Sequence, residues 1–223
     1  MKKLLLVVGP QGSGNHLFSK IFSLHPDVWG WKELNDTYWI QHDQEPFNRF
    51  WVDPRLWLTE DFGDYRYAAV SISVPYVQNG QTVTPCFHDF ISNAQQAGWT
   101  VQVVVIGRDA NILHAQQTRL RGNVTLPQML TAIETELEQH DPVYISHELV
   151  YLYNRRYLKS LSQQLDFPID YNHPEIGNIL SDNANAKYIQ YVDKTDLDIV
   201  VTKAIAASSD PGTEWFERGR ALE

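Results

Sequence analysis

The most informative segment of the chain is Leu4-Leu5-Leu6-Val7-Val8-Gly9-Pro10-Gln11-Gly12-Ser13-Gly14-Asn15-His16. Its first five residues form a continuous apolar run, which is typical of a strand buried on both faces of a parallel sheet. The glycines predict a tight loop, and apolar residues then recur at helical spacing, at Leu17, Phe18, Ile21, Phe22 and Leu24. The helix should end before Pro26, because the residue before a proline avoids the α region. The chain therefore opens with a strand, a glycine loop and a helix.

Later segments continue the alternation of strands and helices. We expect strands over 67–74, 101–106 and 143–146, and helices over 87–97, 109–120, 158–165 and 197–207. A further helix should start at Thr125, with an apolar face of Leu126, Met129, Leu130, Ile133 and Leu137. Residues 34–64 are rich in aromatic side chains and predict short helices and loops, suited to an acceptor-binding insert. The pattern predicts an α/β fold: a single three-layer α/β/α domain over 1–223 with a central parallel sheet.

Composition narrows the class of protein. The 223 residues carry 18 Lys and Arg against 27 Asp and Glu, a formal charge of −9, which argues against a nucleic-acid binder. Cys86 is the only cysteine, so an intrachain disulfide and a cage of cysteines around a metal are excluded. The longest apolar runs fall far short of the roughly 20 residues that a transmembrane helix needs. We therefore expect a cytoplasmic protein, and the sequence leaves its oligomeric state open.

The glycine loop has the composition of an anion-binding site. A strand that ends in a glycine loop and leads into a helix presents backbone N–H groups and the positive end of the helix dipole to a phosphate. The nucleotide-hydrolase pattern G-x-x-x-x-G-K-[ST] fits Gly9 and Gly14, but Asn15 and His16 replace its Lys and its Ser or Thr. The cation for the phosphates and the hydroxyl ligand of magnesium are thus both missing.

A longer comparison of motifs identifies a family. The loop, then Leu24-His25-Pro26-Asp27-Val28, then Lys32-Glu33, resembles the start of P-loop sulfotransferases. The segment 103–109, a strand ending at Arg108, resembles the second signature of that family, and 143–168 resembles its late strand and helix. The resemblance implies the co-substrate 3′-phosphoadenosine 5′-phosphosulfate (PAPS) and an acceptor that is a small molecule or a saccharide.

The resemblance also implies roles for residues. The loop residues Gly9, Pro10, Gln11, Gly12, Ser13, Gly14, Asn15, His16 and Leu17 would hold the 5′-phosphosulfate. Arg108 would contact the 3′-phosphate, with Gln116 beside it, and Glu33 would be the catalytic base, as in the Golgi and bacterial branch. Three positions depart from the family: Gly12 replaces a basic residue, Gln116 replaces a Ser, and Ser73 stands where the cytosolic branch has a catalytic His.

Sulfuryl transfer needs an aligned acceptor, a base and a group that meets the charge developing on the leaving phosphate. We expect the amides of Gly12, Ser13, Gly14 and Asn15 to meet that charge, and His16 or Lys32 to supply the missing cation. His88 is a rival for the base. The histidines show no metal-ligand spacing, so no metal is expected. Two alternatives stay open: a divergent nucleotide kinase or NTPase, and a non-catalytic nucleotide-binding module.

Overall fold

A computed structural model describes residues 2–31, 44–181, 183 and 185. The chain divides into two compact units, Met1–Asn183 and Ala184–Glu223. All helices and strands that the structure describes belong to the first unit. The expected helix over 197–207 lies outside the described residues, as do Lys32 and Glu33.

The centre of the first unit is a five-stranded sheet in the order β2-β3-β1-β6-β7. The strands are β1 Lys2–Pro10, β2 Val28–Trp29, β3 Tyr67–Val74, β6 Trp99–Gly107 and β7 Val143–Ser146. All neighbouring pairs are parallel. β1 lies in the middle because its run from Leu4 to Val8 is fully buried and demands cover on both faces. This confirms the expected α/β class and its parallel sheet.

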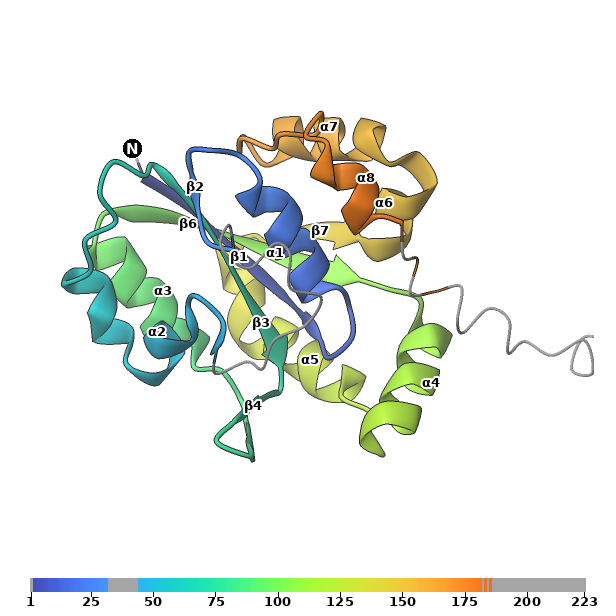
Figure 1. Ribbon diagram of the computed structural model, residues 1–223. Coiled ribbons are helices and arrows are strands. Elements are labelled where there is room, and N and C mark those ends of the chain that lie inside the picture. The colour runs from blue at the N-terminus through green and yellow to red at the C-terminus, as the bar shows by residue number, and fades with distance from the viewer. Residues whose placement is uncertain (1, 32–43, 182, 184, 186–223) are drawn as a thin grey trace, which may run out of the picture. The chain divides into compact units, whose positions relative to one another are not determined.

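Helices cover both faces of this sheet, which gives three layers (Figure 1). Leu5 and Val7 face the side of α1 Asn15–Ser23, α6 His147–Tyr153, α7 Arg155–Gln164 and α8 Glu175–Ile179. Leu4, Leu6 and Val8 face the side of α2 Asn48–Val52, η3 Pro54–Leu58, α3 Phe87–Gln96, α5 Leu126–Ala132 and η4 Ile133–Leu137, after which η5 spans Glu138–His140. The alternation follows from the strand period of two.

The helix α4 Ala110–Arg121 differs from the others because most of its side chains face solvent. It starts where β6 ends and leads away from the sheet (Figure 1). Leu113 and Gln117 are its buried members among the described side chains, whereas Leu120 is exposed. The helix α4 therefore contributes few side chains to the hydrophobic core.

β1 has β3 on one side and β6 on the other, and the connection from β3 to β6 passes across β1, so the order of the strands reverses there. Ligands of open α/β sheets bind at the carboxyl edge of such a switch point. The glycine loop lies at this edge, directly after Pro10.

The prediction that Leu130 belongs to the buried face of its helix is wrong. Half of its surface is exposed, whereas Met129 and Leu137 are buried. The described aromatic residues of 44–64 pack into the core with Phe90 and Trp99; they are Phe47, Phe50, Trp51, Trp57 and Phe62. Tyr38 and Trp39 lie outside the described residues.

A hairpin follows β3 that the sequence reading omitted. β4 Tyr76–Gln78 and β5 Gln81–Val83 pair antiparallel around Asn79 and Gly80, both of which have positive φ. An Asn-Gly pair between short strands is the usual signal for this two-residue turn. Every described helix is too short or too polar to cross a membrane.

Candidate functional site

The glycine loop presents backbone N–H groups at the start of α1. Gly12 and Gly14 have φ of +85° and +106°, conformations that disfavour side chains. The N–H of Ser13 donates to the Pro10 carbonyl at 3.0 Å, so this amide is already engaged within the turn. Within the described residues, no acceptor meets the N–H groups of Gly12, Gly14, Asn15 or His16. These amides can receive an anion.

Arg108 extends from the end of β6 onto the loop. Its Nη1 donates to the Gly12 carbonyl and, at 2.7 Å, to Oε1 of Gln116. A Cβ placed on Gly12 would lie 2.8 Å from that same Oε1, so Gln116 occupies the space of a side chain at position 12. Gly12, Gln116 and Arg108 therefore form one arrangement. Gly12 has no side chain, Gln116 fills the space that one would take, and the guanidinium of Arg108 reaches the loop from the end of β6.

His147 packs against the loop from the end of β7, the strand beyond β6. A Cβ on Gly14 would lie 2.6 Å from Cδ2 of His147, so the ring contacts the loop backbone directly. The side chain is buried, and its Nδ1 finds no hydrogen-bond partner in the described part of the chain. Burial, helped by the Arg108 guanidinium, lowers the pKa of His147 from 6.5 to about 4, although Glu148 acts in the opposite direction. The imidazole is therefore neutral near pH 7.

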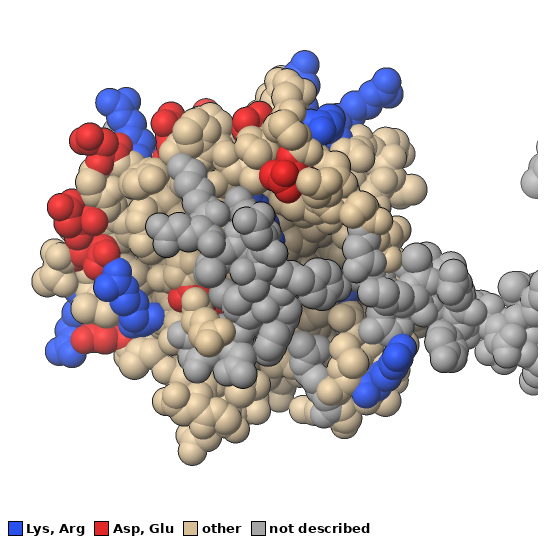
Figure 2. All heavy atoms as spheres, in the orientation of Figure 1, with Lys and Arg blue, Asp and Glu red and all other residues tan. Residues whose placement is uncertain are grey.

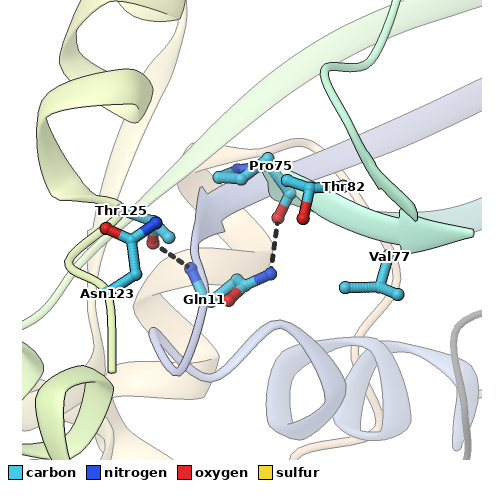
Figure 3. A pocket seen from close by; sticks show the side chains of 6 residues that line it. All are labelled: Gln11, Pro75, Val77, Thr82, Asn123 and Thr125. Carbon is cyan, nitrogen blue, oxygen red and sulfur yellow. Dashed lines mark hydrogen bonds between the residues drawn. The ribbon is translucent and has the colours of Figure 1, made fainter. Parts of the chain in front are cut away.

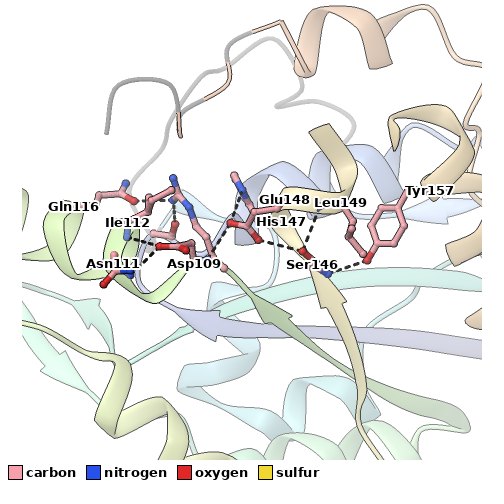
Figure 4. Close-up of polar contacts among 11 residues, drawn as sticks. Asp109, Asn111, Ile112, Gln116, Ser146, His147, Glu148, Leu149 and Tyr157 are labelled. Atoms are coloured by element: carbon pink, nitrogen blue, oxygen red, sulfur yellow. Dashed lines mark hydrogen bonds and ion pairs between the residues drawn. The ribbon is translucent and has the colours of Figure 1, made fainter. Parts of the chain in front are cut away.

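Glu148 ties the ends of β7 and β6 together (Figure 4). Its Oε1 accepts from the N–H of Asp109 at 3.0 Å and its Oε2 from the Ser146 hydroxyl at 3.1 Å. Asp109 in turn caps α4 by accepting from the N–H groups of Asn111 and Ile112. This network fixes the backbone directly after Arg108.

Asn15 and His16 occupy the positions at which the nucleotide-hydrolase pattern has Lys and Ser or Thr, and both side chains make contacts within the protein. The Asn15 amide donates to the Ser73 hydroxyl at 2.9 Å and to the Ile72 carbonyl at 3.2 Å, which ties α1 to β3. Nε2 of His16 lies 2.8 Å from Oε1 of Glu45, and its ring lies 4.8 Å from that of Trp31. Glu45 is buried, so this contact holds the imidazole in place.

Gln11 anchors the first half of the loop. Its N–H donates to the Thr125 hydroxyl at 3.3 Å, and its side-chain Nε2 donates to the Pro75 carbonyl at 3.0 Å. Gln117 completes the link, because it donates to the Gln11 carbonyl and accepts from the Thr125 N–H at 2.7 Å. Thr125 thus holds the loop by its hydroxyl and makes no side-chain cap for α5.

The structure places Arg108 and Gln116 against Gly12 of the loop 9–17. His88 is exposed on α3. Within the described ranges, no group of three His, Cys, Asp or Glu side chains is placed to hold a metal ion. Lys and Arg side chains on the described surface in Figure 2 stand singly or in small groups among Asp and Glu.

Some residues of the site were missed. Glu45 gave no signal, because its partner His16 lies far away in sequence. Ser146 ends the strand β7, and His147 and Glu148 follow it at the same sheet edge as Arg108; that position was the available signal. Gln117 and Thr125 join the loop only through folding, at separations that sequence periodicity does not report.

Comparisons with known proteins give distant similarities. No family model and no curated protein matches the chain. Among solved structures it is similar to the mouse sulfotransferase SULT7A1 complexed with PAP (TM-score 0.42, 13% identity, 80% of this chain and 63% of that one). It is also similar to the tunicamycin resistance protein of Deinococcus radiodurans (TM-score 0.43, 14% identity, 76% of this chain and 98% of that one). The chain thus spans about 63% of the length of the mouse protein. By its own architecture the chain is an α/β protein with a five-stranded parallel sheet and a glycine loop between its first strand and first helix.

Proposed function

We propose that the protein is a sulfotransferase that moves a sulfuryl group from PAPS to a hydroxyl or amine of an acceptor. The contact between Arg108 and the Gly12 carbonyl carries the proposal. The family that the sequence resembles has a basic side chain in the loop, and this chain has none at Gly12. A guanidinium placed there from β6 supplies positive charge beside amides that have no other acceptor among the described residues.

The proposed step is a direct transfer. The acceptor oxygen or nitrogen forms a bond to sulfur while the bond from sulfur to the bridging phosphate oxygen breaks. The leaving group, 3′-phosphoadenosine 5′-phosphate (PAP), keeps that electron pair, and a base takes the acceptor's proton. Loop amides and the Arg108 guanidinium meet the charge that develops on the leaving oxygen.

The base and the donor contacts are part of the proposal. Glu33 and Lys32 keep their roles from the resemblance, although they lie outside the described residues. His16 is held through Nε2 by Glu45, which leaves Nδ1 as the ring nitrogen for a ligand. Because Arg108 lies against Gly12 in the loop, we assign it to the 5′-phosphate of the leaving group in place of the 3′-phosphate that the resemblance implied, with Gln116 beside it.

The contacts at Asn15 and His16 weigh against a nucleotide kinase or NTPase. Such an enzyme needs a cation and a magnesium ligand at these positions. Here the Asn15 amide is bonded to β3, and the His16 ring is bonded to Glu45. The Asn15 amide cannot reach the phosphates of ATP without losing its bonds to β3, and the His16 ring offers no hydroxyl ligand for magnesium.

The test of function is turnover of sulfur-labelled PAPS with a panel of hydroxyl and amine acceptors. We expect formation of PAP and a labelled product with the wild type. The Glu33→Gln variant should lose turnover while keeping its affinity for PAP. Binding of PAP with no turnover on any acceptor or on water would instead identify a non-catalytic nucleotide-binding module.

A further inference from the structure

A pocket of about 390 Å³ lies beside the glycine loop. Pro75, Val77 and Thr82 line it from the end of β3 and the β4–β5 hairpin, and Asn123 and Thr125 line it from the segment between α4 and α5. Gln11, the residue before Gly12, completes the lining between these two sides (Figure 3). The pocket therefore shares one residue with the proposed donor site.

The pocket lining that the described residues form is polar but uncharged. Gln11, Thr82, Asn123 and Thr125 supply amide and hydroxyl groups, and Pro75 and Val77 supply an apolar surface. A charged ligand would lose hydration here without an opposite charge among the lining residues to replace it. A neutral ligand with several hydroxyl groups would exchange its hydrogen bonds with water for bonds to these side chains.

Several of these groups have bonding capacity left. In the described part of the chain, no side-chain partner is found for Thr82 or Asn123, and no donor reaches Oε1 of Gln11. The Thr125 hydroxyl accepts from the Gln11 N–H, so its own proton remains to be donated. Both donors and acceptors thus line the pocket, which suits hydroxyl groups, since each can donate and accept.

The inner part of the pocket is rigidly held. Gln11 and Thr125 are buried, and bonds to Pro75 and Gln117 fix the side chain and backbone of Gln11. Fixed polar groups lose little conformational entropy when a ligand binds. The arrangement has the features of small-molecule sites, in which a few oriented polar groups accompany an apolar wall.

We propose that this pocket binds the acceptor, and that the acceptor is a neutral polyhydroxylated molecule such as a sugar or a cyclic polyol. The identification of the ligand as an acceptor rests on the proposed sulfotransferase function. The binding of such a ligand does not. Because Gln11 belongs both to the pocket lining and to the glycine loop, a ligand in the pocket would lie beside the loop that would hold the donor.

The test uses saturation-transfer NMR of the full chain with methyl glucoside, maltose and myo-inositol, each with glucose 6-phosphate as a charged comparison. We expect transfer to the neutral probes and at least tenfold weaker transfer to the phosphorylated one. Thr82→Trp, which fills the pocket from the hairpin, should weaken binding of the neutral probes at least tenfold. Thr59→Trp, an equally exposed site on another segment, should leave it unchanged.

Val77→Trp is a second filling variant, in case Thr82→Trp disturbs the hairpin. Absence of transfer to every neutral probe, or transfer unchanged in both filling variants, would overturn the proposal. PAP titration of the same samples separates the two ideas. Sugar binding without PAP binding would support the pocket as a sugar site and contradict the proposed sulfotransferase function. PAP binding without sugar binding would support a PAPS-dependent function and contradict the proposed ligand of the pocket.

Discussion

Acid should destabilise this protein through His147 before most carboxylates titrate. The unfolded chain has an ordinary imidazole, with a pKa near 6.5, whereas the folded protein holds that pKa at about 4. Above pH 6.5 neither state binds the proton, so the full stability is present. As the pH falls from 6.5 toward 4, the unfolded state takes up a proton that the folded state excludes, and stability is lost.

The size of this loss follows from the pKa difference. Each pH unit between the two values removes close to 1.4 kcal/mol, so the free energy of unfolding should fall by about 2.5 kcal/mol between pH 7.5 and 4.5 on account of this group. Little reduction for solvent screening applies, because the ring is buried against Gly14. Arg108 and Glu148 are the charged groups that act on it, in opposite directions.

Urea unfolding at a series of pH values measures the effect. The comparison is between the wild type and His147→Gln, since other titrating groups contribute to both. His88→Gln, at an exposed site, is the control for losing a histidine. The wild type and His88→Gln should lose about 2.5 kcal/mol more than His147→Gln over this pH range. Equal losses in all three proteins would show that His147 is not held neutral against the loop.

Three further variants test the contacts around the loop. Gly14→Ala should lower the free energy of unfolding by about 3 kcal/mol, because of the positive φ at this position and the overlap of the new Cβ with His147. In a His147→Ala background the loss should fall to roughly half, measured by urea unfolding of the wild type, the two single variants and the double variant. Asn15→Ala should cost about 1–2 kcal/mol in the same assay by removing the bonds to β3, and an unchanged midpoint would contradict that anchoring role. Glu148→Gln should lower the pKa of His147 further, because the carboxylate favours the charged ring. The pKa is measured by following the imidazole resonances by NMR during acidification, and a raised pKa in the variant would contradict this role of Glu148.

The sheet was predictable because its signal is local. Strands buried on both faces are largely apolar, and the runs at 4–8, 67–74 and 101–106 match β1, β3 and β6 closely. The hairpin at Asn79-Gly80 was also readable and was overlooked. Leu130 follows the helical period but faces solvent, because periodicity reports a shared face and not what packs against it.

The candidate site was predictable only in part. The glycines mark the loop in the sequence, and Arg108 is marked by its place at the end of an apolar strand. Their contact joins residues far apart in the chain, so the placement of Arg108 on Gly12 could not be read from spacing. The same holds for His147 on Gly14, which depends on how β7 pairs with β6.

The most direct test of the account is calorimetric titration with PAP and with magnesium and ATP. PAP should bind the wild type and Arg119→Ala, an exposed change on helix α4, which starts just after Arg108, with equal affinity. Arg108→Ala should bind PAP about 10- to 100-fold more weakly, which corresponds to the loss of one charge-assisted contact of about 1.5–3 kcal/mol. ATP with magnesium should bind more weakly than PAP to all three. Binding of ATP alone, or PAP affinity unchanged by Arg108→Ala, would contradict the claim that this loop and Arg108 hold the sulfuryl donor.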